Sequence, residues 1–154
     1  MIGFVDFLDC KIDLSLRPLI PRSETEYWTE KAITELRNDP RERIQCLDLF
    51  AGSGCIGVSI LKHVESTTFN FAEKDKSLLS QIKTNIKENG IDSSQYNIFQ
   101  SDVFSAVKSS YDYIFANPPY IGETDRDKIQ ESVLKEEPSQ ALFGGDAAVF
   151  ALSD

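Results

Sequence analysis

The tetrapeptide Asn117-Pro118-Pro119-Tyr120, which follows an apolar run at 111–116, has the residue types needed to hold a planar NH2 group. Two consecutive prolines fix the backbone and remove two amide donors, which leaves the side-chain oxygen of Asn117 and the carbonyl of Pro118 as acceptors. A planar amide or amino group offers two N–H donors to such a pair, and the ring of Tyr120 can pack against its face. The alternative is a rigid turn between a strand and a loop. We favour the NH2 site, because a simple turn does not explain the Asn and Tyr beside the prolines.

Three further signals predict a cofactor site. Residues 48–54, Asp-Leu-Phe-Ala-Gly-Ser-Gly, lie between an apolar strand and a helix, and the glycines allow the backbone to approach a ligand closely. Glu73 ends the next apolar segment, where a carboxylate can accept hydrogen bonds from both ribose hydroxyls. Ser101 and Asp102 follow the third, where a carboxylate can bind an adenine amino group. Each signal also has an ordinary explanation, namely a tight turn, a solvated charge and a helix cap.

Together these signals predict an adenosine that lies across one edge of a parallel sheet, next to the NH2-binding tetrapeptide. A phosphate-binding fold fits less well, because no Walker lysine follows Gly54 and the full dinucleotide glycine spacing is missing. An adenosine cofactor beside an NH2 group indicates S-adenosylmethionine as a methyl donor. Its methyl group is bonded to a sulfonium, so in-line transfer to nitrogen needs no metal and depends on positioning and electrostatics.

Hydrophobic periodicity predicts the elements that must position these residues. A hairpin is expected between Phe4 and Leu16, and a helix from Glu24 to about Asn38, with Ser23 and Glu26 as a capping box. Strands and helices then alternate. The expected strands are 44–49, 67–72, 96–100 and 111–116, and the expected helices are 55–63, a segment around 78–86 closed by Asn89-Gly90, and 125–135.

This alternation predicts an α/β fold with a mostly parallel sheet, right-handed crossovers and helices on both faces. Residues 1–22 would form an N-terminal hairpin and an extended lead-in. Residues 23–154 would form a single catalytic domain, since no linker or repeat interrupts them. A turn is expected at Gly144-Gly145-Asp146.

Composition excludes several classes of protein. The 154 residues carry a formal charge of −9, with 25 acidic against 16 basic side chains, so we expect no direct binding to nucleic acid. No apolar run reaches the length of a membrane span and no secretory signal is visible, so we expect a cytoplasmic protein. We also expect it to be a monomer. Cys10, Cys46 and Cys55 are expected to be reduced thiols, and no Cys/His set has metal-ligand spacing.

The motif Asp-x-x-x-Gly-x-Gly followed by Asn-Pro-Pro-Tyr resembles the class I methyltransferases that act on amino nitrogens. Two further stretches, Leu19 to Glu26 and Glu137 to Gly145, resemble segments of the release-factor glutamine methyltransferases, in matching order and spacing. The resemblance implies methyl transfer from S-adenosylmethionine to N5 of the glutamine in the Gly-Gly-Gln loop of peptide-chain release factors. It also implies that the amide binds to Asn117, Pro118, Pro119 and Tyr120, and that the cofactor binds to Asp48, Phe50, Ala51, Gly52, Ser53, Gly54, Glu73, Asp102, Val103 and Asn117.

The sequence departs from this family at several points. Phe50 stands where the family usually has the first glycine of its loop, Ser23 replaces a proline, and Glu73 replaces the more common Asp. The family has a helical domain before the hairpin, and we expect that domain to be missing here. The chain ends at Asp154 after four clear strands, so we expect the C-terminal strands to be missing and the sheet to have an open edge.

Two other functions stay open at this stage. A DNA or RNA amino-methyltransferase would use the same NH2 chemistry, and its glycine loop is of a similar type. A truncated domain that binds the cofactor without catalysis, or merely folds, is the non-enzymatic alternative.

Overall fold

The computed structural model describes residues 3–118, 141–144 and 147–151, and it contains two sheets. A two-stranded antiparallel hairpin is formed by β1 (Phe4–Phe7) and β2 (Cys10–Asp13). The other sheet has six strands in the order β5-β4-β3-β6-β8-β7. Its strands are β3 (Ile44–Leu49), β4 (Thr67–Glu73), β5 (Tyr96–Gln100), β6 (Tyr113–Ala116), β7 (Ala141–Gly144) and β8 (Ala147–Ala151).

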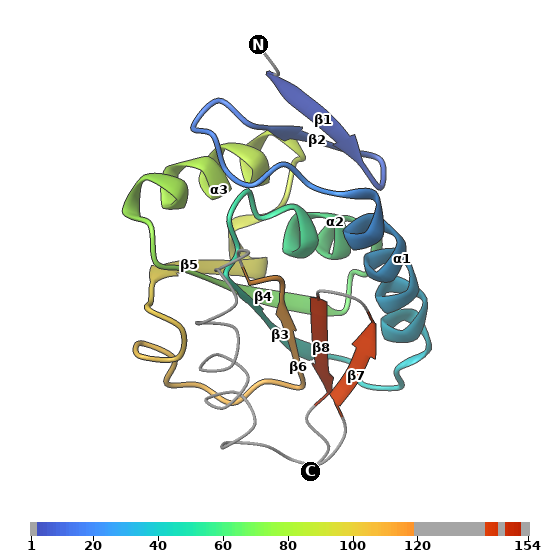
Figure 1. The fold of residues 1–154 in the computed structure, drawn as a ribbon. Coiled ribbons are helices and arrows are strands. Elements are labelled where there is room, and N and C mark those ends of the chain that lie inside the picture. Colours follow the sequence, from blue (N-terminus) through green and yellow to red (C-terminus); the bar gives the residue numbers. More distant parts are fainter. Residues whose placement is uncertain (1–2, 119–140, 145–146, 152–154) are drawn as a thin grey trace.

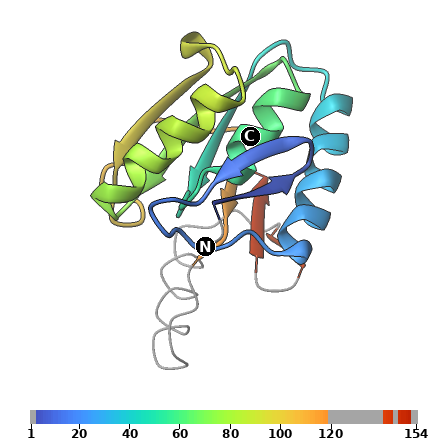
Figure 2. The same ribbon diagram turned by 90° about the horizontal axis from the view of Figure 1, so that it is seen from above.

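Three helices lie between the hairpin and the large sheet, which gives the three layers seen in Figures 1 and 2. They are α1 (Ser23–Asn38), α2 (Cys55–His63) and α3 (Lys76–Glu88), and a short 3-10 helix, η1 (Ser93–Gln95), precedes β5. The expected helices at 24–38, 55–63 and around 78–86, the four parallel strands and the hairpin are therefore confirmed. No helix in the described part of the chain has the length and apolar character to cross a membrane.

Aromatic side chains fill the layer between the helices and the sheet. The ring of Phe115 stacks on those of Trp28, Phe69 and Tyr113, with centroid distances of 6.3, 5.8 and 6.3 Å. Phe69 and Phe71 are fully buried on β4 beneath α2. This cluster fixes which face of each central strand is turned to the helices.

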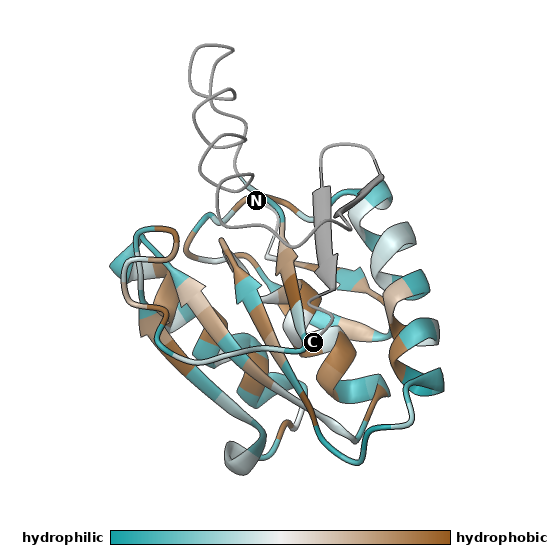
Figure 3. Ribbon diagram, turned by 90° about the horizontal axis from the view of Figure 1, so that it is seen from below, coloured by the Kyte–Doolittle hydropathy of each residue, from teal (hydrophilic) through white to brown (hydrophobic). Residues whose placement is uncertain are grey.

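The opposite face of the sheet is covered differently. The chain between β5 and β6 runs along it (Figure 3) and packs Val103, Phe104 and Val107 against Leu47 and Ile114. The described part of this segment forms turns, and all three described helices lie on the other face. The expected second helical layer is thus absent from the described residues, because the link between β5 and β6 is made of turns. The helix expected at 125–135 lies outside them.

The expectation of four strands was incomplete. Strand β8 pairs antiparallel with β6, and β7 pairs antiparallel with β8, so β6 is not an edge strand. The sequence predicts only a turn at Gly144-Gly145-Asp146 in this region, since each apolar stretch there is short and two glycines interrupt them. Residues 145–146 of the expected turn lie outside the described residues.

The prediction of a capping box at the start of α1 is also wrong. The residue before the helix is Arg22, and no side chain caps the first turn. Glu26 instead accepts a hydrogen bond from the backbone N–H of Leu8 at 3.1 Å, so its carboxylate holds the turn of the hairpin. A contact between distant segments has replaced the local one.

The turn from β3 into α2 uses the left-handed backbone region three times. Phe50, Gly52 and Gly54 have φ values of 60°, 56° and 77°. Glycine adopts this conformation freely, whereas a residue with a Cβ is strained there. The half-buried side chain of Phe50 packs on the cluster of Leu47 and Leu49, which offsets part of this strain.

The left-handed backbone at Phe50 generates a stability prediction. We expect Phe50→Gly to be more stable than Phe50→Ala by about 1 kcal/mol, because both lose the ring but only glycine relieves the strain. Urea unfolding measures the difference. The same pair of substitutions at the exposed helical residue Lys83 is the control, and there alanine should be the more stable by about 1 kcal/mol. Equal or greater stability of the alanine variant at position 50 would contradict the assignment.

Candidate functional site

The carboxyl ends of four parallel strands meet along one edge of the sheet. Leu49 pairs with Ala72 on one side and with Ala116 on the other, and Glu73 pairs with Gln100. The residues that follow these positions are the loop 50–54, Asp102 and Asn117. The structure therefore brings together the segments that the sequence suggested as a cofactor and reaction site. Pro119 and Tyr120 lie outside the described residues.

Strands β3 and β6 flank the switch point of this sheet. The chain leaves β3, builds β4 and β5 on one side, and returns to form β6 on the other side of β3. In open α/β sheets ligands bind at such a point, outside the carboxyl ends of the strands. The loop after β3 and Asn117 after β6 therefore stand on either side of the expected ligand crevice.

The carboxylate of Glu73 supports the glycine loop. Its Oε2 accepts from the N–H of Gly52 at 2.7 Å, and its Oε1 accepts from the N–H of Asp75 at 2.9 Å. The N–H of Ala51 donates to the carbonyl of Ala72 at 3.1 Å, which ties the loop to the same strand. Glu73 thus holds the loop in place, and each of its oxygens keeps a further lone pair for a ligand.

The two glycines of the loop differ in their surroundings. A methyl group added at Gly52 would meet no described atom closer than 3.9 Å, whereas one added at Gly54 would lie 3.2 Å from Cγ2 of Ile82. Gly54 packs on α3, and Gly52 faces open space. This asymmetry fits a loop that is held from behind and approached by a ligand in front.

Asp48 lies beneath the loop rather than at its surface. Its side chain is 0% exposed, and its Oδ2 accepts from the N–H of Gly57 in α2 at 3.1 Å. Its Oδ1 has no hydrogen-bond partner among the described residues. Burial raises the pKa of this carboxyl well above its usual range, the Gly57 bond lowers it, and the Glu73 carboxylate raises it. A direct contact of Asp48 with a cofactor stays a prediction. The buried position of Asp48 indicates that it supports the loop from beneath.

The turn after β5 presents Asp102 to solvent. The N–H of Ser101 donates to the carbonyl of Glu73 at 3.0 Å, and the Ser101 hydroxyl donates to the carbonyl of Val103 at 2.7 Å. Val103 is held in the left-handed region with φ 53°. Asp102 forms an ion pair with Lys74 at 3.2 Å, and its side chain is 60% exposed. No helix follows among residues 102–112, so Asp102 is not a helix cap.

Asn117 and Pro118 are half-buried and directly follow β6, whose four residues are all buried. Cys55, the first residue of α2, places a thiol directly after the loop. Burial raises its pKa to about 12, so it stays protonated and is a poor nucleophile. The described residues contain no group of three His, Cys, Asp or Glu side chains placed to hold a metal ion.

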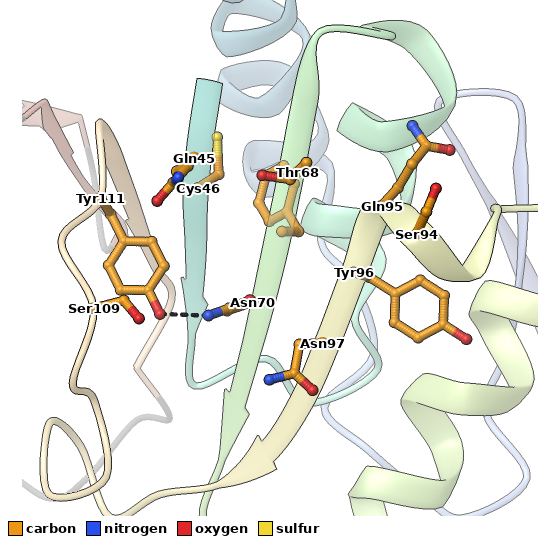
Figure 4. A pocket seen from close by; sticks show the side chains of 11 residues that line it. Gln45, Cys46, Thr68, Asn70, Ser94, Gln95, Tyr96, Asn97, Ser109 and Tyr111 are labelled. Atoms are coloured by element: carbon orange, nitrogen blue, oxygen red, sulfur yellow. Dashed lines mark hydrogen bonds between the residues drawn. The ribbon is translucent and has the colours of Figure 1, made fainter. Parts of the chain in front are cut away.

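A polar groove of about 330 Å³ lies at the other end of the strands (Figure 4). Its lining includes Gln45, Thr68 and Asn97, each within the first two residues of its strand. Asn70 crosses it with a 2.6 Å hydrogen bond to the hydroxyl of Tyr111, which fixes the segment before β6. This groove is separate from the carboxyl edge where the predicted site lies.

Sequence reasoning missed Asn85 on α3. Its side chain is fully buried and donates to the carbonyl of Ser53 in the glycine loop at 2.8 Å. The available signal was a row of amides, Gln81, Asn85 and Asn89, spaced by one helical turn beside the apolar Ile82 and Ile86. Amide side chains on a buried helix face need hydrogen-bond partners, but the sequence pattern does not reveal which groups those partners are.

Burial of Asp48 generates a prediction for stability against pH. A carboxyl whose pKa is raised by folding stabilises the protein fully below about pH 4, and this contribution is lost as the pH rises through the raised pKa. Asp48→Asn keeps an acceptor for Gly57 and cannot ionise. We expect the wild type to lose stability relative to this variant as the pH rises. Urea unfolding between about pH 5 and about pH 8 measures the difference. Parallel curves for the two proteins would show that Asp48 is not buried as a neutral acid.

Known proteins agree with this fold. The family described as methyltransferase small domain matches residues 29–151. The release factor glutamine methyltransferase of Lactococcus lactis is 32% identical over 143 residues, which are 93% of this chain and 51% of that protein. The enzyme of the same name from Koribacter versatilis is 37% identical over 147 residues, or 94% and 50%. The chain thus spans about half the length of these relatives.

A solved structure supports the same fold. The N-terminal domain of human METTL16, in complex with SAH, superposes with a TM-score of 0.59 at 23% identity, and covers 83% of this chain and 56% of that one. The fold is that of the class I S-adenosylmethionine-dependent methyltransferases. Because the family model matches residues 29–151, most of the sequence, the chain belongs to the methyltransferase small domain family.

Proposed function

We propose that the chain transfers a methyl group from S-adenosylmethionine to the side-chain amide nitrogen of a glutamine, in the Gly-Gly-Gln loop of a peptide-chain release factor. The observation that carries this proposal is the position of Asn117. It follows β6 directly, one residue after the Ala116–Leu49 pair, and so stands beside the loop that begins at Phe50. An NH2-binding residue and a cofactor loop at one switch point are what amide methylation requires.

The residues present fit an adenosine cofactor with an amino-acid end. The carboxylates of Glu73 and Asp102 stand at the ends of neighbouring strands, where they would accept from the ribose hydroxyls and the adenine amino group. The loop 50–54 is open on the side of Gly52, and α2 begins directly behind it. The N-terminus of a helix favours a negative group such as the cofactor carboxylate. When bound, S-adenosylmethionine supplies a methyl group on a positively charged sulfur.

Asn117 and Pro118 would bind and orient the amide. The side-chain oxygen of Asn117 and the carbonyl of Pro118 would each accept one N–H of the glutamine NH2 group. Two such bonds aim the nitrogen lone pair in one direction and reduce its conjugation with the amide carbonyl. The nitrogen can lose its surplus proton late, to water, so no strong base is needed. Positioning and electrostatics then account for most of the rate.

Two observations support a release factor as the partner. The relatives named above are release factor glutamine methyltransferases, and Leu19 to Glu26 and Glu137 to Gly145 resemble segments of that family. The net charge of −9 is compatible with a basic protein loop and unfavourable for binding to phosphates. We also propose that the protein acts in the cytoplasm, where release factors work.

The role of Asn117 is tested by replacement with alanine. We expect Asn117→Ala to lower kcat/KM for methyl transfer by at least about 100-fold, because the amide nitrogen is no longer aligned. Affinity for S-adenosylhomocysteine, measured by calorimetry, should change by less than about threefold, equivalent to well under 1 kcal/mol. Asn97→Ala, at an exposed residue of the groove on the opposite end of the sheet, is the control and should transfer at the wild-type rate. Unchanged turnover in Asn117→Ala would refute its role.

Radiolabelled S-adenosylmethionine tests the substrate class. Wild-type protein is incubated with a release factor, with the same factor carrying Gln→Ala in its Gly-Gly-Gln loop, and with duplex DNA. Label is expected only in the unaltered release factor, because it alone carries the glutamine amide that Asn117 would hold against the cofactor. Label in DNA would instead favour an amino-methyltransferase of nucleic acids. Binding of S-adenosylhomocysteine with no label in any sample would favour a cofactor-binding domain without activity.

A further inference from the structure

Three amide side chains, two on α3 and the third at Asn89, the residue that ends the helix, close the free edge of the hairpin. Asn89 accepts from the N–H of Lys11 at 3.0 Å and donates to its carbonyl at 2.9 Å. Asn85 does the same with Asp13, at 2.7 and 3.1 Å. Gln81 accepts from the N–H of Leu16 at 2.9 Å. The backbone groups of β2 that point away from β1 are thereby paired by a helix rather than by a third strand.

Only one of these amides also reaches the glycine loop. The Nδ2 of Asn85 donates a second hydrogen bond, 2.8 Å long, to the carbonyl of Ser53. All the polar atoms of this side chain are then engaged, and the residue is 0% exposed. Figure 1 shows α3 next to the chain that leaves β2, and the hydrogen bonds of Asn85 link β2, α3 and the glycine loop, which are distant in sequence.

The orientation of the Ser53 carbonyl depends on its hydrogen bond, because glycines stand on both sides of this residue. Gly52 and Gly54 on either side are both in the left-handed region, and glycines allow a peptide plane to rotate at low cost. Ile82, one turn before Asn85, packs against the position of Gly54. A buried hydrogen bond to the Ser53 carbonyl therefore selects one orientation of the loop. The loss of that bond would leave a buried carbonyl unpaired unless the loop moved.

We propose that Asn85 is a positioning residue for the cofactor loop, and that it couples the N-terminal hairpin to that loop. This inference rests on the proposed function only in that residues 50–54 hold the cofactor. Binding of the cofactor to the loop then stabilises the folded conformation of β2, and a folded β2 strengthens cofactor binding, since both depend on the same side chain.

Matched substitutions at Asn85 and Asn89 test the proposal. Asn85→Ser and Asn85→Asp remove the donor to Ser53, whereas Asn89→Ser and Asn89→Asp remove similar hairpin bonds and leave the loop untouched. All four are expected to unfold at lower urea concentrations than the wild type. At a temperature where each is folded, only the Asn85 variants should bind S-adenosylhomocysteine more weakly, by about tenfold, the equivalent of one buried hydrogen bond. Equal affinity in both pairs would overturn the proposal and leave the cofactor site in place. Failure of the wild type to bind would refute the proposed function instead.

Amide exchange in the wild-type chain tests the coupling without any substitution. Saturation with S-adenosylhomocysteine should slow exchange of the Asp13 N–H, which is bonded to Asn85, more than that of the Lys11 N–H, which is bonded to Asn89. NMR resolves the two amides. Equal slowing at both positions, or none at Asp13, would overturn the coupling even if the Asn85 variants do not fold.

Discussion

The parallel pairing of β3 with β6 is the contact on which the proposed site depends. It places Ala116 opposite Leu49, so that Asn117 and the loop from Phe50 leave the sheet side by side. A slip of one residue would turn every side chain of β6 to the opposite face. Phe115 and its neighbour on the same strand, Tyr113, would then turn away from Trp28 and Phe69. The aromatic core between the helices and the sheet therefore also sets the alignment of the site.

Support for the glycine loop comes from three directions. Glu73 binds the N–H of Gly52 from the neighbouring strand, Asn85 binds the carbonyl of Ser53 from α3, and Asp48 lies beneath the loop and binds the first turn of α2. A loop whose backbone groups are already paired loses little conformational entropy when a ligand binds, which is the basis of preorganisation. The polar residues around this loop thus fix its conformation, in addition to any contact that they make with a ligand.

Phe50 shows how a departure from the usual glycine is accommodated. Its backbone adopts the left-handed conformation that a glycine would adopt without strain, and its ring packs on the apolar cluster formed by the sheet and the segment between β5 and β6. The same cluster includes Val103, which also adopts a left-handed backbone without being a glycine. Apolar packing between the sheet and the segment that links β5 to β6 therefore holds two strained residues at the edge where the strands end.

Local signals in the sequence determined the order and extent of most elements. Periodicity and the glycine and proline breaks predicted β3, α2 and β5 with the bounds seen in the structure, because helix and strand periods are properties of short segments. The motif residues after each strand were likewise visible, and parallel strands necessarily bring their carboxyl ends to one edge. Only the tertiary structure decided the pairing of β8 with β6, the use of Glu26 to hold the hairpin, and the partners of Asn85. Each of these depends on contact between segments far apart in the chain, where a polar side chain has several possible partners and packing selects one.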